Sequence, residues 1–475
     1  MAFNTAGFLF LFFPAAFLLY RLMPGRRTKN VFLAIASAVF YGFGGLASLP
    51  VLLAAFLWDY LFGRLIAKEE KRAKLWCGIA AAGNLALLGF YKYLAFVLET
   101  LHLPALSQPF ALPLGISFFT FHGISYLVDV YREPSRVCRR ADTLFLYLAF
   151  FPRLIAGPIV RWQDAAAQLA EHPISPEMTA AGLRRLVRGL LKKLLLAESA
   201  AAVANAVYAL APEQLGMGLA WLGAVSYCLQ IFFDFSGYSD MAIGIGMLFG
   251  FEFPENFNYP YVSGSVSEFW RRWHMTLGSF FRDYVYIPLG GNRQGKARQI
   301  LNLLVVWALT GLWHGASWNF VLWGLYFFLL LAIEKQIMPK LERMPFVVRN
   351  LMTMFFVLIG WVLFSHTSMA EIGKNLAAMF GGAPFTNRNT TTRLLNSLPL
   401  LIVCGIGASV LPRWFGFIFS GALGMGRGNR KMQRSVTPGK VVYVLSTFAF
   451  VLLLLWLCTV SLLGTTSSPS IYANF

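Results

Sequence analysis

Runs of about 20 apolar residues recur along nearly the whole chain, and this feature limits the possible fold more than any other. A helix needs roughly that many apolar residues to cross the hydrocarbon core of a bilayer. Hydrophobic residues make up 57% of the 475 positions and charged residues only 13%, whereas soluble domains carry about 25% charged residues. The sequence therefore predicts an all-α polytopic membrane protein with about 10–12 transmembrane or re-entrant helices.

The basic residues are concentrated in short loops between the apolar runs. The formal net charge is +19, from 40 basic and 21 acidic residues. Lys and Arg are frequent around 21–29, 64–74 and 132–140, whereas the loops around 42–49 and 99–110 contain none. The positive-inside rule then places the basic loops in the cytoplasm and the N-terminus outside. Nucleic-acid binding is not expected, because it needs one continuous basic face.

The apolar runs give the positions of most of the membrane helices. We expect spans at 6–22, 30–46, 47–66, 75–98, 110–130, 217–233, 347–365, 396–420 and 441–463. The run from Ile300 to Ile333 must enter and leave on one side if its flanking loops share a compartment, which predicts a break near Gly311–Ser317. The basic amphipathic segment 183–195 is typical of an interfacial helix on an anionic inner leaflet.

Two segments depart from the pattern of simple spans. Residues 112–132 carry His122 within an apolar run, and residues 151–162 carry Arg153 together with two prolines. Proline and arginine at membrane depth are tolerated where irregular backbone lines a cavity inside the protein. Each segment is therefore interpreted either as a broken, re-entrant helix or as an ordinary kinked span.

Two histidines are the main candidates for catalysis. His274 ends the motif FWRRWH, and apolar residues at steps of three and four predict a single amphipathic helix over 266–284. His314 lies in GLWHGASW, where a titratable side chain at membrane depth needs a partner or a water-filled cavity. Imidazole, with an unperturbed pKa of about 6.5, can take a proton from an attacking alcohol. The histidines are 40 positions apart, and the sequence alone cannot bring them together.

Other catalytic chemistries have no motif in this sequence. The chain contains no G-x-S-x-G, H-E-x-x-H or P-loop motif, and its five cysteines form no C-x-x-C pair or zinc spacing. We therefore expect neither a bound cofactor nor a metal ion. Five acidic residues near the candidate histidines are interpreted as structural partners of arginines: Asp234, Asp240, Glu255, Glu268 and Asp283.

Six segments between about residues 105 and 335 resemble the membrane-bound O-acyltransferase family, in its bacterial polysaccharide branch. The matching segments are LPLGISFFTFHGISYLVDVYR (112–132), FPRLIAGPIVRW (151–162), FDFSGYSDMAIGIG (233–246), PENFNYPY (254–261), SEFWRRWHMTLGSFFRDYVYIPLGGNRQG (267–295) and LTGLWHGASWNFVLWG (309–324). Their order and spacing make the resemblance specific, whereas an isolated WHG motif would not.

The resemblance implies a ring of tilted helices around a tunnel that meets a funnel from the outer face. It implies acyl transfer from a cytoplasmic thioester, acetyl-CoA or an acyl carrier protein, to a hydroxyl across the membrane. His314 and His274 correspond to the histidines of the family. Residues that this resemblance places along the substrate tunnel are His122, Arg153, Asn256, Trp270, Arg271, Trp313 and Trp318.

The final residues, IYANF, are similar to a C-terminal aromatic motif of related bacterial systems. In that interpretation Tyr472 enters the funnel and carries the acyl group as an ester; the alternative is a frayed hydrophobic tail. The whole chain is expected to form one acyltransferase domain. Its parts are N-terminal spans (1–110), a catalytic core (111–335), C-terminal spans (336–463) and the tail (464–475).

The sequence leaves three functions to compare. The first is O-acetylation of a secreted or cell-wall polysaccharide at a bacterial plasma membrane, with an extracytoplasmic SGNH/esterase-like acyltransferase as partner. The second is D-alanyl transfer to teichoic acid from an acyl carrier protein. The third is a transporter or flippase for lipid-linked sugars, which predicts inverted repeats that the sequence does not show. All three imply contact with membrane lipids, and none involves nucleic acid.

Overall fold

The computed structural model describes residues 3–104, 111–382, 384–386 and 388–412, with short helical pieces at 452–453, 456–460 and 462. All regular secondary structure in these ranges is helical. Six helical stretches in the same ranges are long and apolar enough to cross a membrane. The prediction of an all-α polytopic membrane protein is confirmed.

The N-terminal helices agree with the predicted spans. They are a π-helical turn η1 (Gly7–Phe12), α1 (Phe13–Leu22), α2 (Gly25–Gly45), α3 (Leu49–Lys68), α4 (Ala73–Leu88), a π-helical segment η4 (Gly89–Tyr93) and α5 (Leu94–Thr100). A single 3-10 turn at Leu46–Ser48 separates α2 from α3. The predicted break between the spans 30–46 and 47–66 is therefore present.

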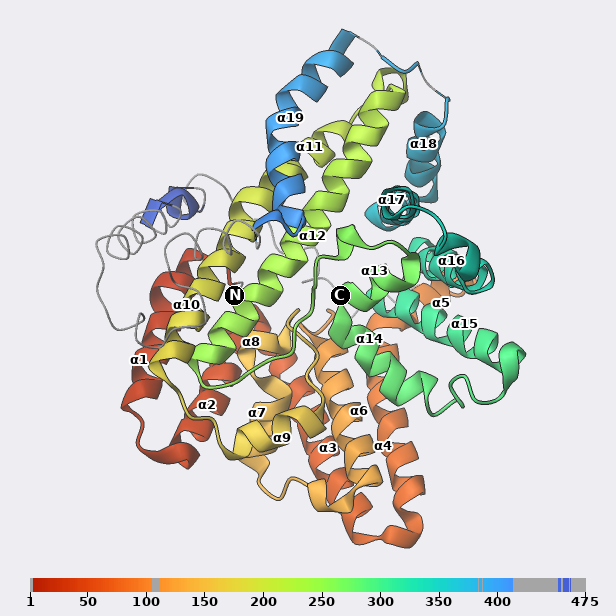
Figure 1. Ribbon diagram of the computed structural model, residues 1–475. Helices are drawn as coiled ribbons and strands as arrows, with labels where there is room; N and C mark the ends of the chain where they lie inside the picture. Colours follow the sequence, from red (N-terminus) through yellow and green to blue (C-terminus); the bar gives the residue numbers. More distant parts are fainter. Residues whose placement is uncertain are drawn as a thin grey trace.

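The three basic loops of the N-terminal half lie together at one end of the protein (Figure 1, lower part). The Tyr60 hydroxyl and the Arg64 guanidinium donate to the main-chain oxygen of Arg139, at 3.1 and 3.3 Å. Arg26, at the start of α2, lines a hollow together with Arg136. Three loops on one side of a membrane must lie at the same end of the protein, as these do. That this side is the cytoplasm stays a prediction.

The two unusual segments fold differently from each other. The helices in this region are α6 (Ile116–Arg132), α7 (Ala141–Ala149), α8 (Phe151–Leu154) and α9 (Trp162–Ala170). Segment 112–132 is an uninterrupted helix after Gly115, whose φ is 68° and where an added Cβ would lie 2.3 Å from the Leu154 oxygen. Segment 151–162 is broken: one helical turn is followed by an irregular, buried stretch to Val160. Only the second segment is interrupted as the re-entrant interpretation predicts, and we call it the re-entrant segment; whether it enters and leaves on one side of the membrane stays a prediction.

The helix α12 (Met217–Leu248) runs through the middle of the molecule (Figure 1). At 32 residues it is about 48 Å long and mostly buried. The predicted span 217–233 is thus part of a longer helix, which continues through the polar segment after it. Beside it lie α10 (Pro176–Leu191), the π-helical segment η6 (Lys192–Ala197) and α11 (Glu198–Tyr208).

Glycines let α10 and α12 approach each other closely. An added Cβ at Gly189 would lie 2.6 Å from the Gly237 oxygen, and one at Gly182 would lie 2.8 Å from the Gly244 oxygen. Helices can approach this closely only where a side chain is absent. The segment predicted to lie on the inner leaflet is therefore packed along a central helix of the protein.

The prediction of one continuous helix over 266–284 is wrong, because the helix is broken at His274. Its parts are α13 (Val266–Arg272), α14 (Met275–Phe281) and the π-helical segment η9 (Arg282–Tyr286). His274 adopts φ 45° and ψ 51°, in the left-handed region, which ends α13 and begins α14. The apolar periodicity continues across the break, so the sequence does not reveal it.

The break predicted near Gly311–Ser317 is present. It separates α15 (Gly295–His314) from α16 (Trp318–Leu341). The remaining helices are α17 (Phe346–Ser365), α18 (Met369–Met379) and α19 (Arg388–Ala408). The end of the predicted span 396–420, most of 441–463 and the tail with Tyr472 lie outside the described residues.

Candidate active site

A non-helical segment between α12 and α13 holds His274 at the helix break. The Met275 amide donates to the main-chain oxygen of Asn256 at 3.0 Å, and the Asn258 amide donates to that of Arg272 at 2.9 Å. The segment therefore runs alongside the break and replaces hydrogen bonds that a continuous helix would make. This pairing explains how His274 keeps a left-handed conformation that residues other than glycine rarely adopt.

The Asn256 side chain determines which nitrogen of His274 carries the proton. Its Oδ1 lies 3.0 Å from His274 Nδ1 and accepts from the Thr276 amide at 3.4 Å. A backbone N–H can only donate, so the Asn256 atom facing it must be the oxygen. His274 Nδ1 must then carry the hydrogen, which leaves the lone pair of the neutral ring on Nε2. No described residue forms a hydrogen bond with that Nε2.

Hydrogen bonds connect Asn256 to three parts of the fold. Its Nδ2 donates to Ser239 Oγ on α12 at 3.1 Å. The Thr276 hydroxyl, on α14, donates to Asn256 Oδ1 at 3.0 Å and accepts from the Ile159 amide at 3.0 Å. Ile159 belongs to the re-entrant segment. The position of the His274 ring thus depends on α12, α14 and that segment together.

Trp313 brings the two histidines to one place. Its ring centroid lies 5.7 Å from that of His274 and 4.9 Å from that of His314. All three side chains are buried. His314 also packs against Trp323 at 5.0 Å and Phe364 at 5.2 Å. Two imidazoles from distant parts of the sequence therefore pack against the same indole in an aromatic enclosure.

The carbonyl end of α15 is held by two residues of η4. The Tyr93 hydroxyl donates to the Leu312 oxygen at 2.8 Å, and Lys92 Nζ donates to the Trp313 oxygen at 2.5 Å. The last carbonyls of a helix lack intrahelical partners, and a cation there is favourable. Lys92 and Tyr93 thus fix the turn that ends in His314. A lysine inside the apolar run 75–98 was a signal for this role, because charge at membrane depth is costly.

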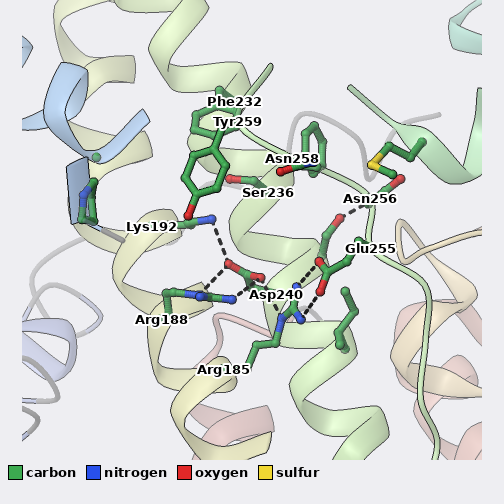
Figure 2. Close-up of a pocket in the computed structure, with 16 residues that line it drawn as sticks. Arg185, Arg188, Lys192, Phe232, Ser236, Asp240, Glu255, Asn256, Asn258 and Tyr259 are labelled. Carbon is green, nitrogen blue, oxygen red and sulfur yellow. Dashed lines mark hydrogen bonds and ion pairs between the residues drawn. The ribbon is translucent and has the colours of Figure 1, made fainter. Parts of the chain in front are cut away.

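A hollow of about 470 Å³ adjoins the His274 side of the site (Figure 2). Arg185, Arg188 and Lys192 line it and surround Asp240, with nitrogen–oxygen distances of 2.9, 3.1 and 2.8 Å. Asn256 also lines the hollow, so one residue contacts both His274 and this basic cavity. We refer to it as the Asp240 hollow.

Comparison with known proteins identifies the family. The model of the membrane-bound O-acyltransferase family matches residues 141–371. A probable alginate O-acetylase of Azotobacter vinelandii is 39% identical over 414 residues, which span 84% of this chain and 82% of the relative. The chain belongs to the membrane-bound O-acyltransferase family. It is an O-acyltransferase.

Two further relatives of this O-acyltransferase are named for different polymers. The peptidoglycan O-acetyltransferase of Helicobacter pylori is 35% identical over 429 residues, 80% of each chain. The teichoic acid D-alanyltransferase of Bacillus subtilis is 28% identical over 273 residues, 53% of this chain and 68% of the relative. Similarity thus extends over more of the chain for the O-acetyltransferases.

Some residues that the resemblance places along the tunnel of the acyltransferase lie away from the histidines. Trp270 packs against Trp323, with ring centroids 5.4 Å apart, so it lies one ring beyond His314. Arg271 is exposed, and Trp318 is 52% exposed and packs against Phe96.

His122 and Arg153 form a second buried cluster. The His122 ring lies 5.5 Å from that of Tyr147, and the Arg153 guanidinium donates to the main-chain oxygens of Tyr147 and Val160. This cluster holds the re-entrant segment in place.

The acidic residues of the acyltransferase pair with cations, as the sequence predicted. Asp240 and Glu255 contact Arg185, and Asp283 contacts Arg161. Glu268 contacts Arg272 at 2.7 Å. Asp234 pairs with a lysine, Lys193, at 2.6 Å, with both side chains almost fully buried. Apart from Glu268, these ion pairs join segments far apart in the sequence, which spacing alone cannot indicate.

Proposed function

We propose that this protein transfers acetyl groups from a cytoplasmic thioester to hydroxyls of a polysaccharide outside the plasma membrane. The observation that carries the proposal is the pair of buried imidazoles that pack against Trp313, with the lone pair of His274 fixed on Nε2. The hydroxyl oxygen bonds to the acyl carbon, the carbon–sulfur bond breaks, and the hydroxyl proton ends on the released thiol. The reaction therefore needs groups that move one proton from oxygen to sulfur.

We assign the two histidines to that proton. His314 takes it from the attacking hydroxyl as general base, a role that typically contributes a factor of about 10²–10⁴. We place His274 on the proton's route to sulfur. Its hydrogen-bond partner Asn256 lines the Asp240 hollow, which we assign below to the thioester donor. Asn256 keeps His274 Nε2 available as an acceptor throughout.

We place the thioester donor at the Asp240 hollow. Its cations outnumber its acids: Arg185, Arg188 and Lys192 face Asp240 and Glu255. The Arg188 side chain remains 57% exposed despite its contact with Asp240. A net positive cavity suits the phosphates of acetyl-CoA and an acidic acyl carrier protein equally. Competition between the two donors in membrane vesicles decides between them.

We propose Tyr472 as an intermediate carrier of the acyl group. Its hydroxyl would attack the thioester, release the thiol and form an aryl ester, and the acceptor hydroxyl would then displace the phenol. Tyr472→Phe removes the nucleophile but keeps most of the apolar surface. Loss of polymer acylation by this variant supports the carrier; full acylation would mean direct transfer from donor to acceptor.

The similarity to O-acetyltransferases supports acetyl over D-alanyl transfer. The relatives named for alginate and peptidoglycan match at 39% and 35% identity over about four-fifths of the chain, against 28% over about half for the D-alanyltransferase. We therefore propose a polysaccharide acceptor, and an SGNH/esterase-like enzyme outside the membrane as partner in the final transfer.

One experiment tests the proposed group and acceptor together. The exported polysaccharide of cells with and without the protein is treated with mild alkali, and the released acids are identified by mass spectrometry. We expect acetate that depends on the protein. Release of D-alanine would assign the protein to teichoic acid, and unchanged release of both acids would exclude acyl transfer to an exported polymer.

A further inference from the structure

A second basic hollow lies at the N-terminal end of α2, separate from the Asp240 hollow. Its volume is about 400 Å³, and five arginines line it: Arg26, Arg27, Arg136, Arg139 and Arg140. None of the residues that line it is acidic. Two of the arginines stand in the first turn of α2 and three in the loop before α7, more than 100 residues later; the two parts fold together because α2 packs against α7. We call it the arginine hollow.

Carboxylates neutralise only part of this charge. Arg136 pairs with Glu133 at 2.7 Å and Arg140 with Asp142 at 2.5 Å. The Arg26 guanidinium donates to the main-chain oxygen of Ala170. Within the described ranges, the exposed side chains of Arg27 and Arg139 form no ion pair. Three guanidiniums therefore lack a carboxylate partner in one cavity, which favours an anionic ligand.

The backbone adds further positive potential. Both α2 and α7 begin at the arginine hollow, and neither helix has a side-chain cap at its N-terminus. The first amides of a helix have no intrahelical acceptor, and the helix dipole makes that end a suitable site for phosphate. Thr143, in the first turn of α7, also lines the hollow. Planar guanidiniums and helix N-termini together match a phosphate group.

Asn30 indicates that the ligand also carries a hydrogen-bond donor. Its side chain lines the arginine hollow and is only 4% exposed. Nδ2 donates to the Leu169 oxygen at 3.0 Å, but Oδ1 has no partner among the described residues. A buried oxygen without a donor costs about 1–3 kcal/mol. A ligand hydroxyl would satisfy it.

The position of the hollow relates it to the membrane. The α2–α3 stretch is one of the six candidate spans, and Arg26 and Arg27 stand in its first turn. Apolar residues, including Val137 and Leu169, form part of the lining. A cavity lined by both basic and apolar residues at the end of a membrane helix lies at the depth of lipid headgroups.

We propose that the arginine hollow binds the headgroup of an anionic phospholipid. The phosphate lies among Arg26, Arg27 and Arg139, and a glycerol hydroxyl of the headgroup donates to Asn30 Oδ1. A short chain of contacts leads from the arginine hollow to the candidate active site. Trp162 lines the hollow. Three residues earlier in the sequence, the Ile159 amide donates to the Thr276 hydroxyl, which in turn donates to Asn256 Oδ1.

The test compares two double variants with the same loss of charge. Arg27→Gln/Arg139→Gln removes two guanidiniums from the arginine hollow. Lys71→Gln/Arg72→Gln removes two exposed cations from the nearby α3–α4 loop and is the control. Native mass spectrometry of the full-length protein in detergent measures binding of phosphatidylglycerol, with phosphatidylcholine as the reference lipid.

We expect phosphatidylglycerol to bind the Arg27→Gln/Arg139→Gln protein at least about tenfold more weakly than the control protein, since each cation near an anionic lipid contributes measurably. Equal affinities of the two variants would overturn the site. If the double variant does not fold, Arg27→Gln alone provides the comparison. Coenzyme A and inorganic phosphate serve as competitors: displacement of the lipid by coenzyme A would overturn the lipid assignment, because the site would then bind the donor.

Discussion

At the scale of single residues, the candidate site depends on neighbours that have no acid–base chemistry of their own. Asn256 cannot accept a proton from a substrate, yet its contact with the Thr276 amide fixes which nitrogen of His274 can. Trp313 likewise has no acid–base chemistry but packs against both imidazoles. The catalytic pair and the residues that hold it should therefore respond differently to substitution.

Substitution of His314 by Ala should abolish ester-linked acetate on the exported polymer, because it removes the group that we assign as general base. A rate loss of about 10²–10⁴ is expected. Alkaline release of acetate measures it, and immunoblotting of membranes checks that the protein is present. His314→Gln is the control for shape. Normal acetylation by a well-expressed alanine variant would rule out His314 as the base.

Asn256 offers a graded test of the His274 tautomer. In Asn256→Asp a carboxylate oxygen still accepts from Nδ1–H and from the Thr276 amide, so substantial activity should remain. Asn256→Leu removes that acceptor, and we expect at least a tenfold loss (on the order of general-base contributions). Thermal unfolding of both proteins separates this effect from instability. Equal activity of the two variants would show that the tautomer is unimportant.

At the scale of helices, the sequence predicted most of the membrane helices and some of their breaks, but not the break at His274. The charges of the flanking loops predicted the break beside His314, because they require both ends of the run on one side. The break at His274 had no such signal, because apolar periodicity continues from α13 into α14. That break depends on hydrogen bonds to the segment around Asn256, which are tertiary contacts.

Close contact between α10 and α12 has a measurable consequence. Gly189→Ala places a methyl group 2.6 Å from the Gly237 oxygen, so the helices must separate. We expect a loss of about 1–3 kcal/mol in stability. Gly78→Ala is the matched control, because an added Cβ there meets no atom within 4 Å. Unfolding temperatures of the two purified proteins should differ clearly; a similar temperature for both would contradict the close crossing.

At the scale of the whole molecule, three basic loops gather at one end, and the sequence assigned all three to the cytoplasm. The candidate site residues were identified largely by resemblance, since hydropathy alone cannot bring residues 274 and 314 together. Lys92 was missed although it is a charge within a predicted span. Lysine side chains are long, so their partners depend on packing that local sequence does not encode.

Topology can be tested by thiol labelling in intact cells. Cysteines placed at Lys71 and Arg136 should be protected from an impermeant reagent, and one placed at Gly45 should be labelled, because positive loops stay inside. The described native cysteines are buried and give a low background. The opposite pattern would reverse the orientation and move the arginine hollow to the outer face.

The backbone at the candidate site has a consequence for how this enzyme can evolve. Tyr259 and His274 have φ of 46° and 45°, values that favour glycine. Each such residue costs roughly 1–2 kcal/mol. Selection of a mutant library for heat resistance alone should therefore enrich glycine at the half-buried Tyr259. At position 274, the packing and the hydrogen bond of the buried ring offset the backbone cost, and selection for acetylated polymer should retain histidine there. Deep sequencing of the two populations would show at which positions thermal stability and acyl transfer favour different residues.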